Sequence, residues 1–488
     1  MNLIELSRDI EERYRRYLKT TFYFKEPDLR ASFEEALNSG YLSKGPYLEA
    51  TSVFKRGQTP RKLFTHLLGS QPDEGFLKAI DGDRPLYRHQ EQAIEGVSRE
   101  SNVIVTTGTG SGKTESFLYP ILLHLYREFQ EGKLSPGVRA LILYPMNALA
   151  NDQRDRLGEE ISERLKKEQS SFRFTFGQYI GETPEDENDS WRNARDHMAK
   201  RLPGELVLRS EMRKTPPHIL LTNYSMLEYL LLRPDDSPLF DNGQAQWWKF
   251  FVLDEAHQYR GSRGIEMAML LRRLKQRLKE GGRFEPFRCI ATSATLVGGE
   301  EGDKVAVAKF ASDLFGEEFH EENVIFGETD PIREAGPGSL SPDEYRFLGD
   351  VIREKKEETR GRVVELATKF GISFSQNEDL MKIISELLQR DSRATALRRL
   401  ITGNPTEAAE VAAQIFADLQ DNKRLPALSE LVELLLKVRD PVSNAPLLSA
   451  RYHLFLRSIE GAFVSYWPQK KVLLDRRTQD PQSIAFEV

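Results

Sequence analysis

A glycine-rich segment carries the clearest chemistry in the sequence. The apolar run at 102–106 leads into Thr107-Gly108-Thr109-Gly110-Ser111-Gly112-Lys113-Thr114, and a helical pattern follows. Such a turn directs consecutive backbone N–H groups and the helix dipole at phosphate oxygens. Lys113 is expected to reach the β- and γ-phosphates, and Thr114 to hold Mg²⁺. The common pattern begins with glycine, where this sequence has Thr107. The phosphate-binding candidates are Thr109, Gly110, Ser111, Gly112, Lys113, Thr114 and Glu115.

A second group of polar residues follows another apolar run. Residues 250–253 (FFVL) are followed directly by Asp254-Glu255-Ala256-His257. A carboxylate at the carboxyl end of a parallel strand, beside a phosphate loop, can hold Mg²⁺. Asp254 is the metal-side candidate, and Glu255 is the candidate base that orients the attacking water. Taken alone, such a pair could also be the acidic start of a helix.

A third group, Ser293-Ala294-Thr295, follows the run at 289–292. Ser293 and Thr295 are small hydroxyl residues at the end of a strand. They could hydrogen-bond to the acidic pair and so couple its state to the bound nucleotide, although such residues are common at strand ends.

The elements that position these residues are short apolar runs separated by amphipathic helical segments. The runs lie at 102–106, 140–144, 218–222, 250–253 and 289–292. Strands that are apolar throughout are buried on both faces, which indicates a parallel sheet with crossover helices. The sequence therefore predicts an α/β fold with one doubly wound parallel-sheet lobe.

Outside this lobe the pattern changes, which predicts five parts. Residues 1–83 are a helical N-terminal region, and 84–325 are the nucleotide-binding lobe. Residues 326–345 contain a Pro/Gly/Ser cluster and are a linker. Residues 346–449 show helical spacing and are a helical accessory region. Residues 450–488 are rich in aromatic and β-branched residues and are the start of a further, truncated domain.

The composition excludes several classes of protein. The chain has 488 residues with 39% hydrophobic and 30% charged residues, and its net charge of −6 argues against a polybasic binder. Cys289 is the only cysteine, which excludes a disulfide framework or a cysteine-based metal site. No secretory signal and no membrane-spanning apolar run is present, so we expect a cytoplasmic location and no membrane partner.

The ordered motifs resemble those of superfamily 2 DEAD/DEAH-box helicases. This resemblance implies a RecA-like lobe that binds ATP and Mg²⁺, with Gln90 of Tyr87-Arg88-His89-Gln90 reading the adenine. It also implies that His257 couples nucleotide state to a second lobe. Three further segments, at 144–153, 179–183 and 222–224, resemble motifs that grip the nucleic-acid backbone. Their candidate contact residues are Pro145, Asn147, Gln153, Gly181, Thr183, Thr222 and Asn223.

The exact residues of these motifs resemble one branch of this superfamily more closely. Residues 222–229 (TNYSMLEY) and 254–261 (DEAHQYRG) resemble bacterial DNA helicases related to the mitomycin-repair helicase and to Lhr and Hrq-type enzymes. Large helicases of anti-phage defence systems share this wording. The resemblance implies 3′→5′ movement on single-stranded or tailed duplex DNA, in repair or in phage defence. It covers 84–320 strongly and Tyr452–Gly461 weakly.

No segment from 300 to 488 resembles the arginine-finger motif of a second RecA-like lobe. Because an arginine finger can contribute 10³–10⁵ in rate, we expect the chain to bind ATP and hydrolyse it weakly. The expectation is the front half of a larger helicase, whose second lobe acts in cis or in trans, together with other repair or defence subunits. Two alternatives stay open: a nucleotide-gated interaction module that does not unwind, and an RNA helicase, since these motifs contact phosphates rather than bases.

Overall fold

The chain folds into two compact units in the computed structural model. The model describes residues 3–38, 42–51, 53–108, 110–294, 303–336, 338–354, 359–375, 378–441, 445–457, 463–467, 469–474 and 486–487. One unit is Phe54–Thr329, and the other combines Met1–Val53 with Asp330–Val488. The first is therefore inserted, in sequence, between the two segments of the second.

The unit Phe54–Thr329 is built on an eight-stranded sheet with the order β5-β4-β6-β3-β7-β8-β2-β9. All of its strand pairs are parallel. Each of the five predicted apolar runs forms a strand, which confirms the doubly wound α/β fold. The strands are β2 (Val103–Thr106), β3 (Ala140–Tyr144), β4 (Phe176–Tyr179), β5 (Glu205–Leu206), β6 (Ile219–Asn223), β7 (Phe250–Leu253), β8 (Arg288–Ser293) and β9 (Val324–Phe326).

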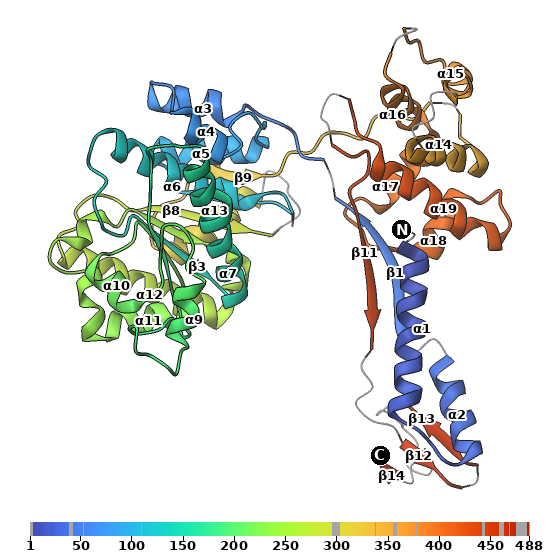
Figure 1. The fold of residues 1–488 in the computed structure, drawn as a ribbon, viewed down its shortest axis with the longest axis horizontal. Coiled ribbons are helices and arrows are strands. Elements are labelled where there is room, and N and C mark those ends of the chain that lie inside the picture. The colour runs from blue at the N-terminus through green and yellow to red at the C-terminus, as the bar shows by residue number, and fades with distance from the viewer. Residues whose placement is uncertain are drawn as a thin grey trace. The chain divides into compact units, whose positions relative to one another are not determined.

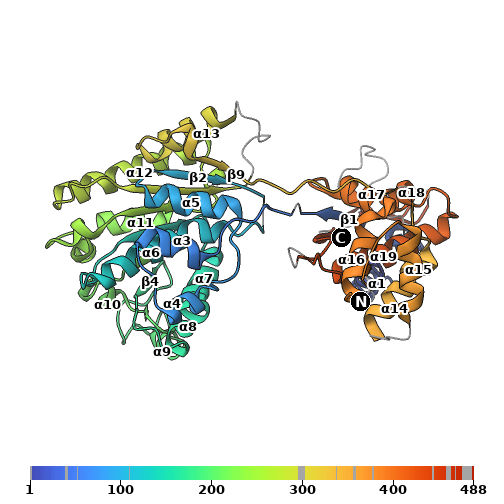
Figure 2. The same ribbon diagram turned by 90° about the horizontal axis from the view of Figure 1, so that it is seen from above.

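Helices cover both faces of this sheet (Figure 2). Successive strand residues point to opposite faces, so Val103 and Val105 enter one core while Ile104 enters the other. The first core contains α3 (Pro60–Leu68), α4 (Glu74–Ala79), α5 (Arg88–Ser98), α6 (Lys113–Gln130), α7 (Asn147–Asp155), a π-helical turn (Arg156–Ser162) and α8 (Glu163–Lys167). The second contains α10 (Arg209–Lys214), α11 (Tyr224–Leu232), α12 (Gly261–Glu280) and α13 (Asp303–Phe315). The short helix α9 (Ala194–Ala199) lies between β4 and β5.

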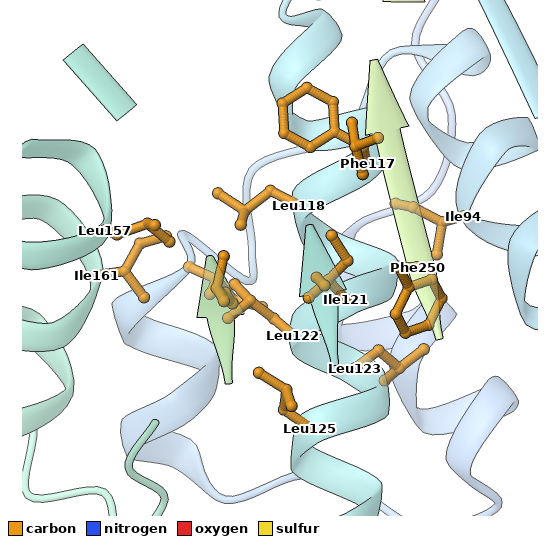
Figure 3. Packing of buried hydrophobic residues seen from close by; sticks show 14 of the residues in the cluster. Ile94, Phe117, Leu118, Ile121, Leu122, Leu123, Leu125, Leu157, Ile161 and Phe250 are labelled. Carbon is orange, nitrogen blue, oxygen red and sulfur yellow. The ribbon is translucent and has the colours of Figure 1, made fainter. Parts of the chain in front are cut away.

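Figure 3 shows part of the first core. Phe117, Leu118 and Ile121 of α6 lie with Leu157 and Ile161 of the π-helical turn. This packing fixes the helix that starts at the glycine-rich loop, and so it positions Lys113 and Thr114.

The boundary of this unit differs from the predicted one. Residues 54–83 were assigned to a separate helical region, yet they belong to the unit of the sheet. Leu63, Phe64 and Phe76 of α3 and α4 are fully buried in the first core. These two helices pack on the apolar residues of the first core. Because this contact joins segments that are far apart in the sequence, the local helical pattern does not predict it.

The other unit contains a helical bundle and a small antiparallel sheet. The predicted helical region corresponds to α14 (Pro342–Glu354), α15 (Arg360–Lys369), α16 (Leu380–Arg390), α17 (Ser392–Ile401), α18 (Ala408–Ile415) and α19 (Asp421–Lys437). Their apolar faces share one core with Leu48, Ala50 and Tyr452. A smaller core joins α1 (Leu3–Thr21) and α2 (Pro27–Asn38) to β12 (Phe463–Ser465) and β13 (Lys471–Leu473).

Two long strands run side by side in this unit (Figure 1). β1 (Ser43–Ala50) pairs antiparallel with β11 (Ala450–Leu456) along its length and with the short β10 (Thr406–Glu407) on its other side. The sequence predicts a helical region over 1–83, and the strand β1 within it differs from that prediction. The β-rich part at 450–488, which also includes β14 (Phe486–Glu487), completes this unit with the N-terminal residues, where a separate further domain was predicted.

Residues next to each unit boundary are hydrogen-bonded to one another within their own unit. Asp330 N–H donates to the Val53 carbonyl at 2.8 Å, and Lys55 N–H donates to the Glu328 carbonyl at 2.9 Å. The predicted linker at 326–345 overlaps two elements: its first residue lies in β9, and α14 starts at Pro342, before the predicted end of the linker.

Cys289 is buried in β8. Among the described residues, no helix is both long and apolar enough to cross a membrane.

Candidate nucleotide and nucleic-acid site

The glycine-rich loop lies between β2 and the first turn of α6. Gly110 and Gly112 adopt left-handed backbone angles, with φ of 78° and 69°. The left-handed φ of Gly112 favours glycine, and a Cβ atom there would lie 2.5 Å from the Gln90 Nε2, which would have to shift. The Thr107 and Ser111 hydroxyls are 2.5 Å apart and close the loop. Backbone N–H groups at a helix start, in a turn that side chains cannot occupy, fit a phosphate chain.

His89 and Gln90 of the predicted adenine-reading segment form hydrogen bonds with this loop. His89 is fully buried, and its Nε2 lies 2.9 Å from the Ser111 carbonyl oxygen. Because a carbonyl only accepts, the His89 Nε2 carries the proton. Gln90 Nε2 donates to the Gly112 carbonyl at 2.8 Å, and Gln90 Oε1 accepts from the Tyr87 N–H. The side chains of His89 and Gln90 therefore support the loop by hydrogen bonds to the backbone carbonyls of Ser111 and Gly112.

Lys113 and the acidic pair meet at the carboxyl edge of the sheet. Lys113 Nζ lies 3.4 Å from Glu255 Oε1 and 3.4 Å from the Thr107 carbonyl oxygen. Asp254 is buried and accepts a hydrogen bond from the Thr292 hydroxyl. Burial raises the pKa of Asp254 above its ordinary value, and the Thr292 hydrogen bond offsets part of that rise. A buried carboxylate beside the loop and the half-buried Thr114 suits a divalent cation between phosphate oxygens.

The loop after β7 is held in a conformation that is rare for a carboxylate residue. Glu255 has a φ of 53°, and its N–H donates to Asp254 Oδ1 at 3.1 Å. His257 Nδ1 lies 3.2 Å from Glu255 Oε2 and accepts from the Ala294 N–H at 3.3 Å. The Ser293 hydroxyl is 3.4 Å from the same nitrogen. Ser293 therefore reaches the acidic motif through His257. Thr109 and Thr295, also predicted site residues, lie outside the described residues.

A cavity of about 210 Å³ opens beside the glycine-rich loop. Its lining includes Tyr87, Gln90, Gly112, Glu115 and Arg156. Glu115 accepts a hydrogen bond from Gln90 Nε2 at 3.3 Å and forms an ion pair with Arg156. An aromatic ring, an amide and paired charges next to the loop suit a polar, planar base.

The candidate backbone-gripping residues gather at the carboxyl ends of three neighbouring strands, β4, β6 and β3. Asn223 Nδ2 donates to Asn147 Oδ1 at 2.7 Å, which joins two of the predicted segments. Gly181 is exposed, and Pro145 and Gln153 are partly exposed. These five residues can reach a ligand at this edge.

Thr183 and Thr222 are a correction to the predicted contact set. Both are buried, and their hydroxyls donate to the backbone carbonyls of Gln178 at 2.7 Å and Tyr179 at 2.6 Å. Their side chains therefore hold the loop after β4 in place and do not offer a free hydroxyl to a ligand.

Sequence reasoning missed three residues of this site. His89 stood next to Gln90 in the quoted motif, so its position was a usable signal. Thr292 is the last residue of a predicted apolar run, where a lone hydroxyl indicates a specific partner. Arg156 lies 41 residues from its partner Glu115, and nothing in the local pattern marks it.

A parallel sheet that ends in a glycine-rich loop, a lysine and an acidic pair with a buried aspartate defines a RecA-like ATP-binding lobe. The family model of the DEAD/DEAH box helicases matches residues 87–301. Residues 87–301 are therefore similar to the DEAD/DEAH box helicase domain.

Several curated proteins are similar in sequence. The Druantia protein DruE of Escherichia coli (strain UMEA 4076-1) is 28% identical, and the match covers 94% of this chain and 30% of DruE. The uncharacterized ATP-dependent helicase YprA of Bacillus subtilis (strain 168) is 31% identical, covering 50% of this chain and 27% of YprA. The ATP-dependent helicase hrq1 of Schizosaccharomyces pombe is 28% identical, covering 43% and 16%. The chain spans less than a third of the length of these relatives.

Two solved structures match part of this chain. The DUF1998 helicase MrfA bound to DNA is 20% identical with a TM-score of 0.40, covering 71% of this chain and 41% of that one. The Mycobacterium smegmatis helicase Lhr, bound to ssDNA and AMP-PNP, is 19% identical with a TM-score of 0.38, covering 70% and 41%.

Proposed function

We propose that this chain provides the ATP-binding lobe of a DNA helicase or translocase. The observation that carries the proposal is the approach of Lys113 Nζ to Glu255 Oε1 at 3.4 Å, next to the buried Asp254. Lys113 would bind the β- and γ-phosphates, with Thr114 and Asp254 holding Mg²⁺. Glu255 would orient the attacking water and accept its proton.

The same lobe offers a route from nucleic acid to nucleotide. α7 begins at Asn147, a proposed backbone contact, and continues directly into the π-helical turn that starts at Arg156. Arg156 pairs with Glu115, which accepts from Gln90 beside the proposed base cavity. A shift of α7 when nucleic acid binds would therefore move Arg156 and change its ion pair with Glu115. Ser293 and His257 would provide a second link, to a second RecA-like lobe.

The proposed substrate is single-stranded or tailed duplex DNA, with 3′→5′ movement, in repair or in phage defence. Support comes from the motif wording shared with DNA helicases of this branch. A second RecA-like lobe, in cis or in trans, would supply the arginine fingers.

The test is ATP hydrolysis by this chain with no nucleic acid, with single-stranded DNA, and with RNA of the same sequence. We expect weak hydrolysis that DNA stimulates more than RNA, and a loss of about 10²–10⁴-fold in Glu255→Gln. Lys113→Ala should also lose nucleotide binding. Lys133→Ala, at a lysine 69% exposed in the loop before β3, is the matched control. Nucleotide binding without any DNA-stimulated turnover would favour the interaction module, and greater stimulation by RNA would favour the RNA helicase.

A further inference from the structure

The outer face of the β1–β11 ribbon has features that the helicase domain does not account for. Tyr47 lies opposite His453, Lys44 opposite Phe455, and Glu49 opposite Arg451. A bulge at 45–46 places Lys44 and Tyr47 on the same face although they are three residues apart. A Cβ atom on Gly45 would lie 2.7 Å from the His453 carbonyl oxygen, so glycine is needed in this bulge.

The two faces of the ribbon differ sharply. On the inner face, Leu48 and Ala50 are 0% and 2% exposed and enter the helical core together with Tyr452. On the outer face, the Tyr47 and Phe455 rings lie 6.0 Å apart edge to face, and the His453 and Phe455 rings stack 6.5 Å apart. Phe455 is nevertheless 60% exposed. The outer face thus carries a row of aromatic rings, of which Phe455 is exposed and Tyr47 and His453 are half-buried.

The charges beside these rings are mainly positive. Lys44 and Arg451 are both exposed on this face. Glu49 on the same face accepts a hydrogen bond from His453 Nε2 at 2.9 Å and lies opposite Arg451. A chain of net charge −6 therefore presents cations at this ribbon, next to planar rings.

We propose that this face binds single-stranded nucleic acid, with bases on Tyr47 and Phe455 and phosphates beside Lys44 and Arg451. Partly exposed aromatic rings beside cations along a strand suit stacked bases and a phosphate backbone. A protein-docking surface, in contrast, is depleted in lysine at its centre. The inference rests on the proposed nucleic-acid substrate, but it does not depend on ATP hydrolysis. It adds a second contact, outside the helicase domain.

The first measurement is photo-crosslinking of the full chain to a thymidine oligonucleotide that carries 5-iodouracil, followed by mass spectrometry. Peptides containing Tyr47, His453 or Phe455 should carry the crosslink, in the parent and equally in Lys113→Ala. The second measurement is affinity for the same oligonucleotide. Phe455→Ala should weaken binding by about 5- to 100-fold, the range for one stacked base.

Phe284→Ala is the matched control, because Phe284 is 91% exposed in the other unit. It should bind like the parent. The proposal requires both results: crosslinks confined to Phe54–Thr329, or an unchanged affinity of Phe455→Ala, would overturn it. DNA-stimulated hydrolysis in the parent would still support the proposed function in that case.

Discussion

At the scale of single residues, two glycines of the phosphate loop provide a matched test. Gly112 has a φ of 69° and its Cβ position lies against Gln90 and Glu115, whereas a Cβ atom on Gly108 would meet nothing within 4 Å. Gly112→Ala should therefore weaken ATP binding by about 5- to 150-fold, since strain of about 1–3 kcal/mol falls on the loop. Gly108→Ala should bind within about twofold of the parent. Titration with a fluorescent ATP analogue measures both, and equal affinities would refute the steric argument.

A buried histidine predicts how stability depends on pH. His218 is 7% exposed, its Nδ1 accepts from the Thr175 N–H, and burial lowers its pKa to about 4. The unfolded chain, with a histidine pKa near 6.5, binds a proton there that the folded chain excludes. The contribution of His218 to stability is thus fully present above pH 6.5 and is lost as the pH falls toward 4.

Urea unfolding between pH 5 and 7 measures this dependence. His218→Gln should reduce the pH slope of the unfolding free energy by up to about 1.4 kcal/mol per pH unit. His66→Gln, at an exposed histidine, is the control and should leave the slope unchanged. Identical slopes in parent and His218→Gln would show that another group dominates.

At the scale of elements, Asn223 joins a helix start to a neighbouring loop. Its Oδ1 caps α11 by accepting from the Met226 N–H at 2.8 Å, and its Nδ2 donates to Asn147. Asn223→Asp keeps the cap and removes the donor, whereas Asn223→Ala removes both. The alanine variant should lose about 1 kcal/mol of stability, with the aspartate variant near the parent. Both should bind single-stranded DNA more weakly. Equal stability of the two variants would contradict the cap.

The elements that the sequence predicts are those whose contacts are local or periodic. β2, β3 and β7 are buried along their whole length, so continuous apolar runs identify them. β1 has the sequence SKGPYLEA, with glycine and proline in its interior, and it exists because β11 pairs with it. No local pattern predicts a partner that distant. For the same reason Lys113 and Glu255 were predictable from their motifs, while the Arg156–Glu115 pair was not.

At the scale of the whole molecule, the two units make different demands on a fragment. The cores on both faces of the eight-stranded sheet are drawn from Phe54–Thr329 alone. A fragment of residues 54–329 should therefore fold and bind ATP. The predicted lobe, 84–325, lacks Leu63, Phe64 and Phe76, and burial of each such side chain contributes about 1.5–3 kcal/mol. That shorter fragment should unfold at markedly lower temperature or aggregate. Thermal unfolding followed by circular dichroism, together with nucleotide titration, compares the two fragments. Equal stability of the two fragments would support a domain boundary at residue 84.

The pairing of β1 with β11 also sets an order of events during synthesis. Glu49 and His453, which touch across the ribbon, are separated by 404 residues. At 5–20 residues per second, a ribosome needs about 20 to 80 s between them. The unit Phe54–Thr329 is synthesised before α14–α19, whose core Leu48 and Ala50 enter, and before β11. Residues 43–50 must therefore be kept from aggregating until α14–α19 and β11 have emerged.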